Sequence, residues 1–208
     1  MQTQKIEVYF DGLCQPYNPG GIACYAFVIK KYGNNNNNDE TCVWQTIYSQ
    51  YGLAAEPFTN DASNNVAEYM GIINALEWLL LLPQLNGDNS KIIVRGDSKL
   101  VVYQIKGKYK AKASRIVPLH QTVMSLISKF KILNIEWIPR EQNMDADRLS
   151  NKAYQEFLDN NPALREKISE HLATDEQLEL LKNLGIKPDK YLSKIEAHRT
   201  IKNSKTSR

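Results

Sequence analysis

Four carboxylates lie beside apolar segments of the chain, where a folded protein usually avoids unpaired charge. Two of them follow apolar runs that are typical of strands, and two lie near the starts of helix-like segments. A single acid in such a place is usually a cap, but four of them indicate a cluster. Clustered carboxylates repel each other and are costly to bury, so they need cations. These residues are Asp11, Glu68, Asp97 and Asp147.

Hydrophobic periodicity predicts the elements that must position these acids. It indicates strands at 5–11, 22–31, 41–51, 91–97 and 132–138, and helices at 65–82, 98–105, 114–130 and 144–158, with polar breaks at 33–38 and 86–89. Short connections among the first three strands predict an antiparallel meander, and the later crossovers predict parallel pairs. The expected fold is α/β, with helices flanking a five-stranded mixed sheet of three antiparallel and two parallel strands. Asp11 and Asp97 would then emerge at one carboxyl edge, where such sheets bind ligands.

Four motifs, taken in this order and in these contexts, resemble type 1 ribonuclease H of the archaeal and bacterial kind. The resemblance covers about residues 4–155 and implies a ribonuclease H-like fold. It also implies an endonuclease that hydrolyses the RNA strand of RNA·DNA hybrids and leaves 5′-phosphate and 3′-hydroxyl ends. The motifs are Asp11-Gly12, Asn64-Asn65-Val66-Ala67-Glu68, Asp97-Ser98 and Asn143-Met144-Asp145-Ala146-Asp147.

The resemblance assigns the four acids to metal binding. Asp11 would bridge two Mg²⁺ ions, Glu68 and Asp97 would complete the shell of one ion, and Asp147 would hold the other. Two divalent ions about 3.5–4 Å apart activate a water and stabilise the leaving oxygen. Carboxylates suit Mg²⁺ because it prefers oxygen ligands, and Mn²⁺ is a possible substitute. Asp145 competes with Asp147 for the fourth role, but the spacing of four residues from Asn143 favours Asp147.

The same resemblance predicts the contacts with the substrate. Hybrids differ from DNA by 2′-hydroxyls in a wide minor groove, which amides and a close backbone can contact. A solvated loop is the alternative for the lysines, and helix capping is the alternative for the asparagines. The predicted substrate-binding residues are Gly12, Asn64, Asn65, Ser98, Lys108 and Lys110, the lysines belonging to the basic stretch around Tyr109.

The chain departs from the family pattern in the loop before the last acid. Many relatives carry a histidine there, whereas His120, His171 and His198 all lie outside it. Arg140 occupies this loop, and we assign it a catalytic role in turnover or in contact with the product phosphate. Lys99 also stands where some relatives have Gln.

Length and composition fit one catalytic domain, residues 1–158, with an appendage. The chain has 208 residues, of which 42% are apolar and 24% charged. Its longest apolar stretch is shorter than the roughly 20 residues that a bilayer requires, and its three cysteines show no zinc spacing. Without a signal-peptide pattern at the N-terminus, we expect a cytoplasmic protein, monomeric and without membrane contacts.

Residues 159–208 lie outside the resemblance and predict a helical extension. A capping box at 174–177 starts one helix, and the polar segment from about 199 is expected to be disordered. The segment from Lys182 onward contains eight basic residues and two acids. Its net charge is therefore +6, whereas the whole chain has a net charge of +3. This basic end favours nucleic-acid binding. Alternative functions are cleavage of double-stranded RNA, a role in a mobile element, or a non-catalytic module that binds hybrids.

Overall fold

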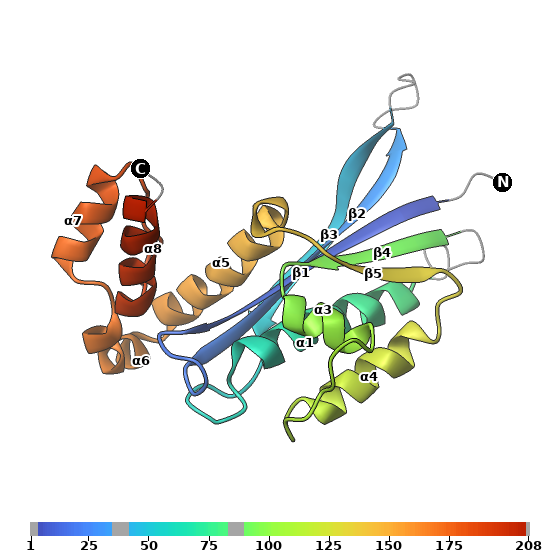
Figure 1. Ribbon diagram of the computed structural model, residues 1–208, viewed down its shortest axis with the longest axis horizontal. Helices are drawn as coiled ribbons and strands as arrows, with labels where there is room; N and C mark the ends of the chain where they lie inside the picture. Colours follow the sequence, from blue (N-terminus) through green and yellow to red (C-terminus); the bar gives the residue numbers. More distant parts are fainter. Residues whose placement is uncertain (1–3, 35–41, 83–89, 207–208) are drawn as a thin grey trace.

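A central five-stranded sheet organises the molecule (Figure 1). The computed structural model describes residues 4–34, 42–82 and 90–206. The strand order is β3-β2-β1-β4-β5, with β1–β2 and β2–β3 antiparallel and β1–β4 and β4–β5 parallel, so the predicted fold class is confirmed. The strands are β1 (Gln4–Gln15), β2 (Ile22–Asn34), β3 (Cys42–Leu53), β4 (Ser90–Gly96) and β5 (Leu133–Trp137). The predicted breaks at 35–38 and 86–89 lie outside the described residues.

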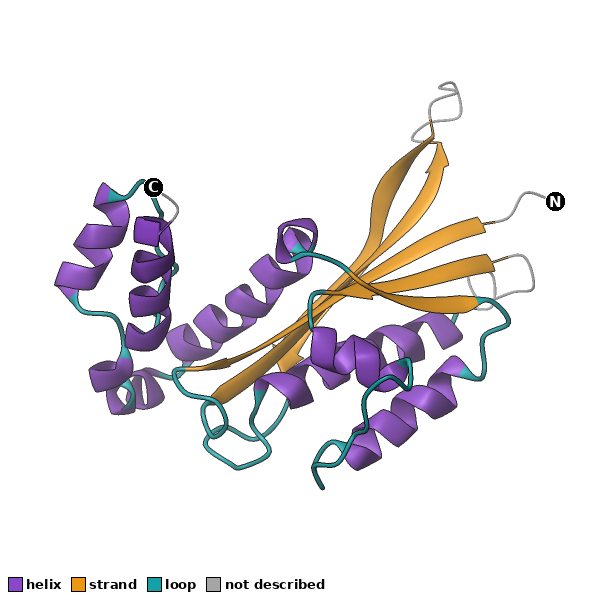
Figure 2. Cartoon of the chain, in the orientation of Figure 1, coloured by secondary structure: helices purple, strands orange, loops and turns teal. Residues whose placement is uncertain are grey.

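Helices cover both faces of this sheet (Figure 2). One face carries α1, with α3 and α4 beside it, and the other carries α5. The helices are α1 (Asn64–Leu80), α3 (Lys99–Ile105), α4 (Val117–Ile127), α5 (Met144–Asn160), α6 (Pro162–Lys167), α7 (Asp175–Asn183) and α8 (Lys194–Thr206), with short 3₁₀ turns η1 (Arg140–Gln142) and η2 (Ser169–His171). Among the described residues, no helix combines the length and apolar composition that a membrane span needs.

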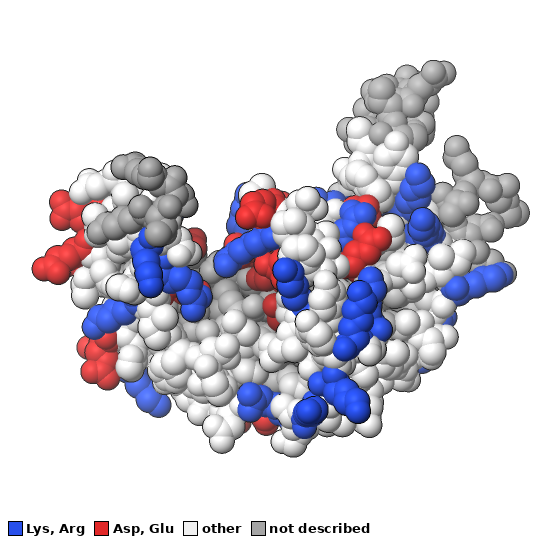
Figure 3. Space-filling view, in the orientation of Figure 1, with Lys and Arg blue, Asp and Glu red and all other residues white. Residues whose placement is uncertain are grey.

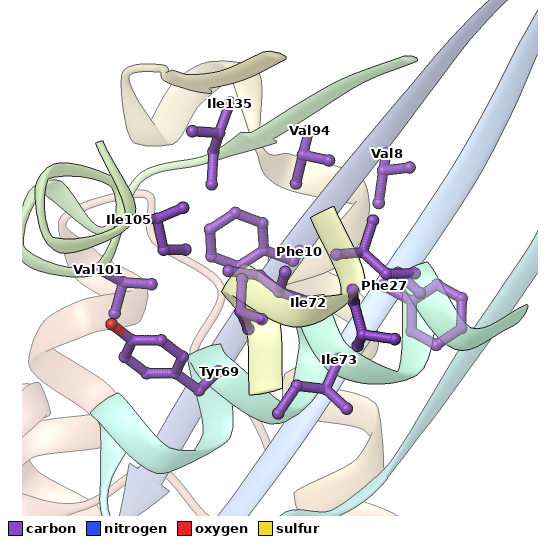
Figure 4. Close-up of a cluster of buried hydrophobic side chains, with 14 of the residues drawn as sticks. Val8, Phe10, Phe27, Tyr69, Ile72, Ile73, Val94, Val101, Ile105 and Ile135 are labelled. Carbon is purple, nitrogen blue, oxygen red and sulfur yellow. The ribbon is translucent and has the colours of Figure 1, made fainter. Parts of the chain in front are cut away.

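Alternation along β1 explains why helices pack on both sides. Val8 and Phe10 point toward α1 and are fully buried, as the close-up of the core shows (Figure 4). Leu13 faces the other way and packs with Tyr154 and Leu158 of α5. Side chains that alternate along a strand point to opposite faces of the sheet, so one strand anchors both helix layers.

The first strand extends beyond its predicted end at Asp11. β1 does not stop at Asp11, because residues 11–15 continue to pair with β2, from Asp11 opposite Ala26 to Gln15 opposite Ile22. The parallel ladder with β4 ends earlier, at Tyr9 opposite Arg95. Asp11 therefore lies just beyond the parallel part of the sheet, at its carboxyl edge, while its backbone stays fixed by β2.

The C-terminal residues form helices rather than the expected disordered end. α8 runs to Thr206, so the prediction of disorder from about residue 199 is wrong for the described part. Ala197 and Ile201 of α8 pack against Leu181 of α7 in a small separate core, which explains why a largely polar segment folds. The predicted capping box is confirmed at Thr174 and Gln177. We call residues 162–206 the C-terminal module.

Candidate active site

Three of the predicted acids converge where β1, β4 and α1 meet. Carboxylate oxygens of Asp11, Glu68 and Asp97 all lie within 4.8 Å of one another. Asp11 extends from β1, Asp97 follows β4 directly, and Glu68 lies in the second turn of α1. Ser63, rather than the asparagines that follow it, caps α1 through its side chain. Asp11 and Asp97 are far apart in the sequence, but the parallel pairing of β1 with β4 brings them close together in space.

Burial and mutual repulsion disfavour the charged forms of two of these acids. Burial raises the pKa of Asp11 to about 7, and the charges of Asp97 and Asp147 add to the shift while a hydrogen bond from Ser150 opposes it. Burial also raises the pKa of Glu68 well above its usual value, as do the charges of Asp11 and Asp97. The Ser98 side chain lowers it by hydrogen bonding. The cluster therefore gains stability from any cation placed among its oxygens.

Polar side chains that the sequence-based assignment did not include hold the cluster in place. Asn143 is fully buried, and its Nδ2 donates to the Phe10 carbonyl at 2.9 Å and to Asp97 Oδ1 at 3.0 Å. The Ser150 hydroxyl donates to Asp11 Oδ2. The indole of Trp137 donates to the carbonyl of Asp97 at 3.0 Å. Ser150 lies three residues after Asp147 on one helix, a spacing that places both on the same face and would have identified it.

Asp147 lies in the first turn of α5 and lines one cavity together with the other three acids. Its Oδ1 accepts from Arg140 Nη2 at 2.6 Å, and Asn151 Nδ2 donates to its backbone carbonyl at 2.9 Å. Asp145 is turned elsewhere, since its carboxylate forms an ion pair with Lys30 of β2 at 2.7 Å. The structure thus separates the two candidate acids. Asp147 faces the cluster, as the spacing from Asn143 predicted.

A cavity of about 160 Å³ opens onto these four acids. Besides the four acids, three other predicted residues line it: Gly12, Asn64 and Arg140. The Oδ1 atom of Asn64 is buried without a hydrogen-bond partner. Asn65 does not line this cavity, and Lys108 and Lys110 are exposed in the segment after α3. The structure therefore brings the acids, Gly12, Asn64 and Arg140 together and leaves the lysines outside.

The close packing of β1 against α1 requires a glycine at position 12. A Cβ atom at this position would lie 2.3 Å from the backbone nitrogen of Glu68 and 2.6 Å from the carbonyl carbon of Ala67. Backbone atoms cannot move aside as a flexible side chain can, so glycine lets β1 approach α1 closely. This approach brings Asp11 next to Glu68.

The donor set fits divalent cations that prefer oxygen. The cluster consists of carboxylates, and Oε2 of Glu68 is buried without a hydrogen-bond partner. An unpaired buried carboxylate oxygen is costly unless a ligand satisfies it. Carboxylates with no thiol or imidazole among them suit Mg²⁺ or Mn²⁺ rather than softer metals.

Comparisons with known proteins agree with this geometry. Residues 49–153 match the family model described as Reverse transcriptase-like. The bifunctional protein Rv2228c of Mycobacterium tuberculosis is 36% identical over 111 residues, which is 53% of this chain and 29% of that protein. The chain thus matches less than a third of the length of this curated relative.

Solved structures extend the likeness across the catalytic region. LC11-RNase H1, solved in complex with an RNA/DNA hybrid, is 30% identical with a TM-score of 0.58, covering 74% of this chain and 99% of that one. The N-terminal RNase H domain of Rv2228c is 30% identical with a TM-score of 0.56, covering 72% and 92%. The arrangement of the four acids on this sheet and the likeness to these relatives lead to the same conclusion. The chain belongs to the type 1 ribonuclease H family.

Proposed function

We propose that this protein is a metal-dependent endonuclease that hydrolyses the RNA strand of RNA·DNA hybrids, giving 5′-phosphate and 3′-hydroxyl ends. The observation that carries this proposal is the convergence of three carboxylates within 4.8 Å, two of them with raised pKa values, beside the amide of Asn64. Such a cluster is unfavourable for a protein that only binds nucleic acid, because it repels phosphates. A hydrolase needs it, so a non-catalytic binding module is the weaker alternative.

We further propose that the acids hold two Mg²⁺ ions, or Mn²⁺ as a substitute. Asp11, Glu68 and Asp97 would be ligands from the rigid sheet and α1, and Asp147 would be a ligand from the start of α5. When bound, divalent ions supply an activated water and charge stabilisation of the leaving oxygen. Asn143 and Ser150 orient Asp97 and Asp11 through their hydrogen bonds, so the ligands are positioned before the metal arrives.

The remaining residues of the cavity would bind the substrate and product. The Asn64 amide both donates and accepts hydrogen bonds, which suits a 2′-hydroxyl of the RNA strand. Arg140 is 70% exposed in its side chain and pairs with Asp147, so it can exchange this carboxylate for a phosphate oxygen. We therefore assign Arg140 to the release of the 5′-phosphate product.

The decisive experiment follows cleavage of four labelled 20-base-pair duplexes: RNA·DNA hybrid, double-stranded RNA, double-stranded DNA and a DNA duplex with one ribonucleotide. Each is incubated with Mg²⁺, Mn²⁺ or EDTA. We expect cleavage of the hybrid with either metal and none with EDTA, with products that carry 5′-phosphates. Asp11→Asn should lower kcat at least about 100-fold. Cleavage in EDTA, or equal loss of activity in Asp145→Asn, would contradict the proposal.

A further inference from the structure

The C-terminal module borders the active-site cavity, although it lies outside the family resemblance. Glu196 of α8 lines the same 160 Å³ cavity as the four acids. A neighbouring cavity of about 240 Å³ lies between Asn18 and Asn64 on one side and Ile195 and Arg199 on the other. The two cavities share Cys14, Gln15, Asn64 and Glu196. They therefore form one continuous groove that leads away from the acids along α8.

A third cavity extends this groove past the other side of the acids. It measures about 490 Å³ and is lined by Arg148, Asn151 and Lys152 of α5 and by Asp189 of the C-terminal module. It shares Asp147 and Asn151 with the active-site cavity. The module thus contributes Asp189, the start of α8 and Arg199 to the groove, and the catalytic core supplies the other side. Figure 3 shows the hollow between them, with Lys and Arg side chains on the bordering part of the module.

This wall is fixed to the core rather than loosely tethered. Ile168 is 1% exposed and packs in the cluster formed by β1, β2 and α5. The segment that returns to α8 is attached at Tyr191, whose hydroxyl donates to Asp159 Oδ1 at 2.5 Å, and at Lys190, which forms an ion pair with the same carboxylate at 2.7 Å. Leu172 and Ser193, which follow these two attachment points in the chain, form an antiparallel β-bridge. The start of α8 is therefore held at a defined position beside the acids.

The wall presents a cation to the groove. The side chain of Arg199 is 64% exposed and pairs with Glu196 Oε1 at 3.0 Å, within one turn of α8. Glu196 faces the acids, and its backbone nitrogen donates to Ser193 Oγ at 3.2 Å. The ion pair fixes the direction of the guanidinium while leaving most of its donors available. Such a guanidinium suits a phosphate group of a strand that runs through the groove.

We propose that the C-terminal module is a second wall of the substrate groove, and that Arg199 binds a backbone phosphate of the RNA strand beside the cleaved bond. Continuity with the catalytic cavity and the exposed guanidinium of Arg199 identify this occupant. The inference rests on the proposed function, because it takes the RNA strand as the occupant. It adds a contact made by residues that the catalytic core does not contain.

The first test measures binding separately from cleavage. In the full-length Asp11→Asn background with Ca²⁺, fluorescence anisotropy gives the Kd of a labelled 20-base-pair hybrid between 50 and 300 mM salt. Arg199→Ala should weaken binding roughly threefold to tenfold, and the slope of log K against log salt should fall in magnitude by about one. Lys187→Ala is the matched control, since this exposed lysine belongs to the same module and lines none of the three cavities. Equal effects of the two variants, or no detectable hybrid binding, would overturn the inference.

A kinetic readout distinguishes this inference from the proposed function. In the wild-type background, Arg199→Ala should raise KM by the same factor and leave kcat unchanged, because the contact is made equally in the ground and transition states. If the wild-type protein does not cleave hybrids, the proposed function fails, whereas a selective loss of affinity in Arg199→Ala would still support the wall.

Hydrogen exchange gives a third readout that needs no substitution in the module. Adding hybrid to the Asp11→Asn protein should slow amide exchange in residues 193–199 and leave residues 175–183 of α7 unchanged. Protection of both segments alike would show that the hybrid stabilises the whole module, without a specific contact along α8, and would contradict the proposal.

Discussion

Asn143 carries no charge, yet it connects three parts of the active site. Its amide donates to β1 at the Phe10 carbonyl and to the Asp97 carboxylate, and its own backbone carbonyl accepts from Asp147 at 3.0 Å as α5 begins. The strand that bears Asp11, the acid that follows β4 and the helix that bears Asp147 are thereby held together. At the scale of single residues, the placement of the acids relative to one another therefore depends on the side-chain amide of Asn143.

We expect Asn143→Ala to reduce both stability and activity. The substitution leaves the Phe10 carbonyl buried without a donor, which costs about 1–3 kcal/mol, and it releases Asp97. For a protein of this size, Tm should fall by about 2–4 °C for each kcal/mol. Thermal denaturation and kcat are the measurements. Asn134→Ala on β5 is the control, because Asn134 is exposed, and a comparable loss there would refute the role of Asn143.

The raised pKa of Asp11 predicts how stability depends on pH without metal. Its folded pKa of about 7 lies above its ordinary value of 3.8, so between these values the folded protein binds a proton that the unfolded chain has released. This stabilising contribution is present below pH 4 and is lost as pH rises through 7. In EDTA, Tm should therefore fall between pH 5 and 8, and Asp11→Asn should flatten this decline. Added Mg²⁺ should restore Tm at pH 8; a Tm that rises with pH in EDTA would contradict the prediction.

At the scale of elements, the close contact between β1 and α1 brings Asp11 and Glu68 together. Gly12→Ala should destabilise the protein by roughly 1–3 kcal/mol, because its Cβ would meet the backbone of α1 at 2.3 Å and force the two elements apart. Gly33→Ala in β2 is the matched control, since a Cβ there meets nothing within 4 Å. Urea denaturation of both variants tests the prediction. Similar unfolding midpoints for the two would show that the contact adjusts easily.

The elements were predictable from local signals, and the four acids were predictable from the motifs that carry the family resemblance. Alternation located the strands, and Asn143 placed Asp147 ahead of Asp145, whose ion pair with Lys30 now explains its different direction. The continuation of β1 beyond Asp11 was not predictable, because it depends on pairing with residues 22–26 of β2. The buried bonds from Asn143 to Phe10 and from Ser150 to Asp11 were also missed, since they join residues more than 130 positions apart, although the spacing of Ser150 from Asp147 was a local signal for the second.

At the scale of the whole molecule, the C-terminal module is attached through a few buried side chains. Ile168→Ala should cost about 2–5 kcal/mol, because it opens a cavity in the cluster shared with β1, β2 and α5. Since this cluster joins the module to the core, unfolding should still occur in one transition, at a lower Tm. Ile195→Ala is the control, with Ile195 60% exposed. Calorimetry that shows two separate transitions in the wild type would contradict this coupling.

The position of the C-terminal module relative to the catalytic core could not be predicted from the sequence. Its helices were expected, but α8 has few apolar residues, and two of them, Ala197 and Ile201, pack across helices against Leu181. Its position beside the acids depends on Ile168 and Tyr191, which carry no signal of their own in the sequence. Contacts between distant segments, rather than local preference, therefore determine the groove.

The strand order has a consequence for a chain that is still being synthesised. β1 is the central strand, and it can pair with β2 and β3 soon after these residues leave the ribosome, whereas β4, β5 and α5 follow much later. Asp11 is thus made early, but Asp97 follows it 86 residues later, and Asn143 and Asp147 follow more than 130 residues later. A growing chain would carry an incomplete set of ligands for most of its synthesis. The four acids would therefore come together only after the residues of α5 have left the ribosome.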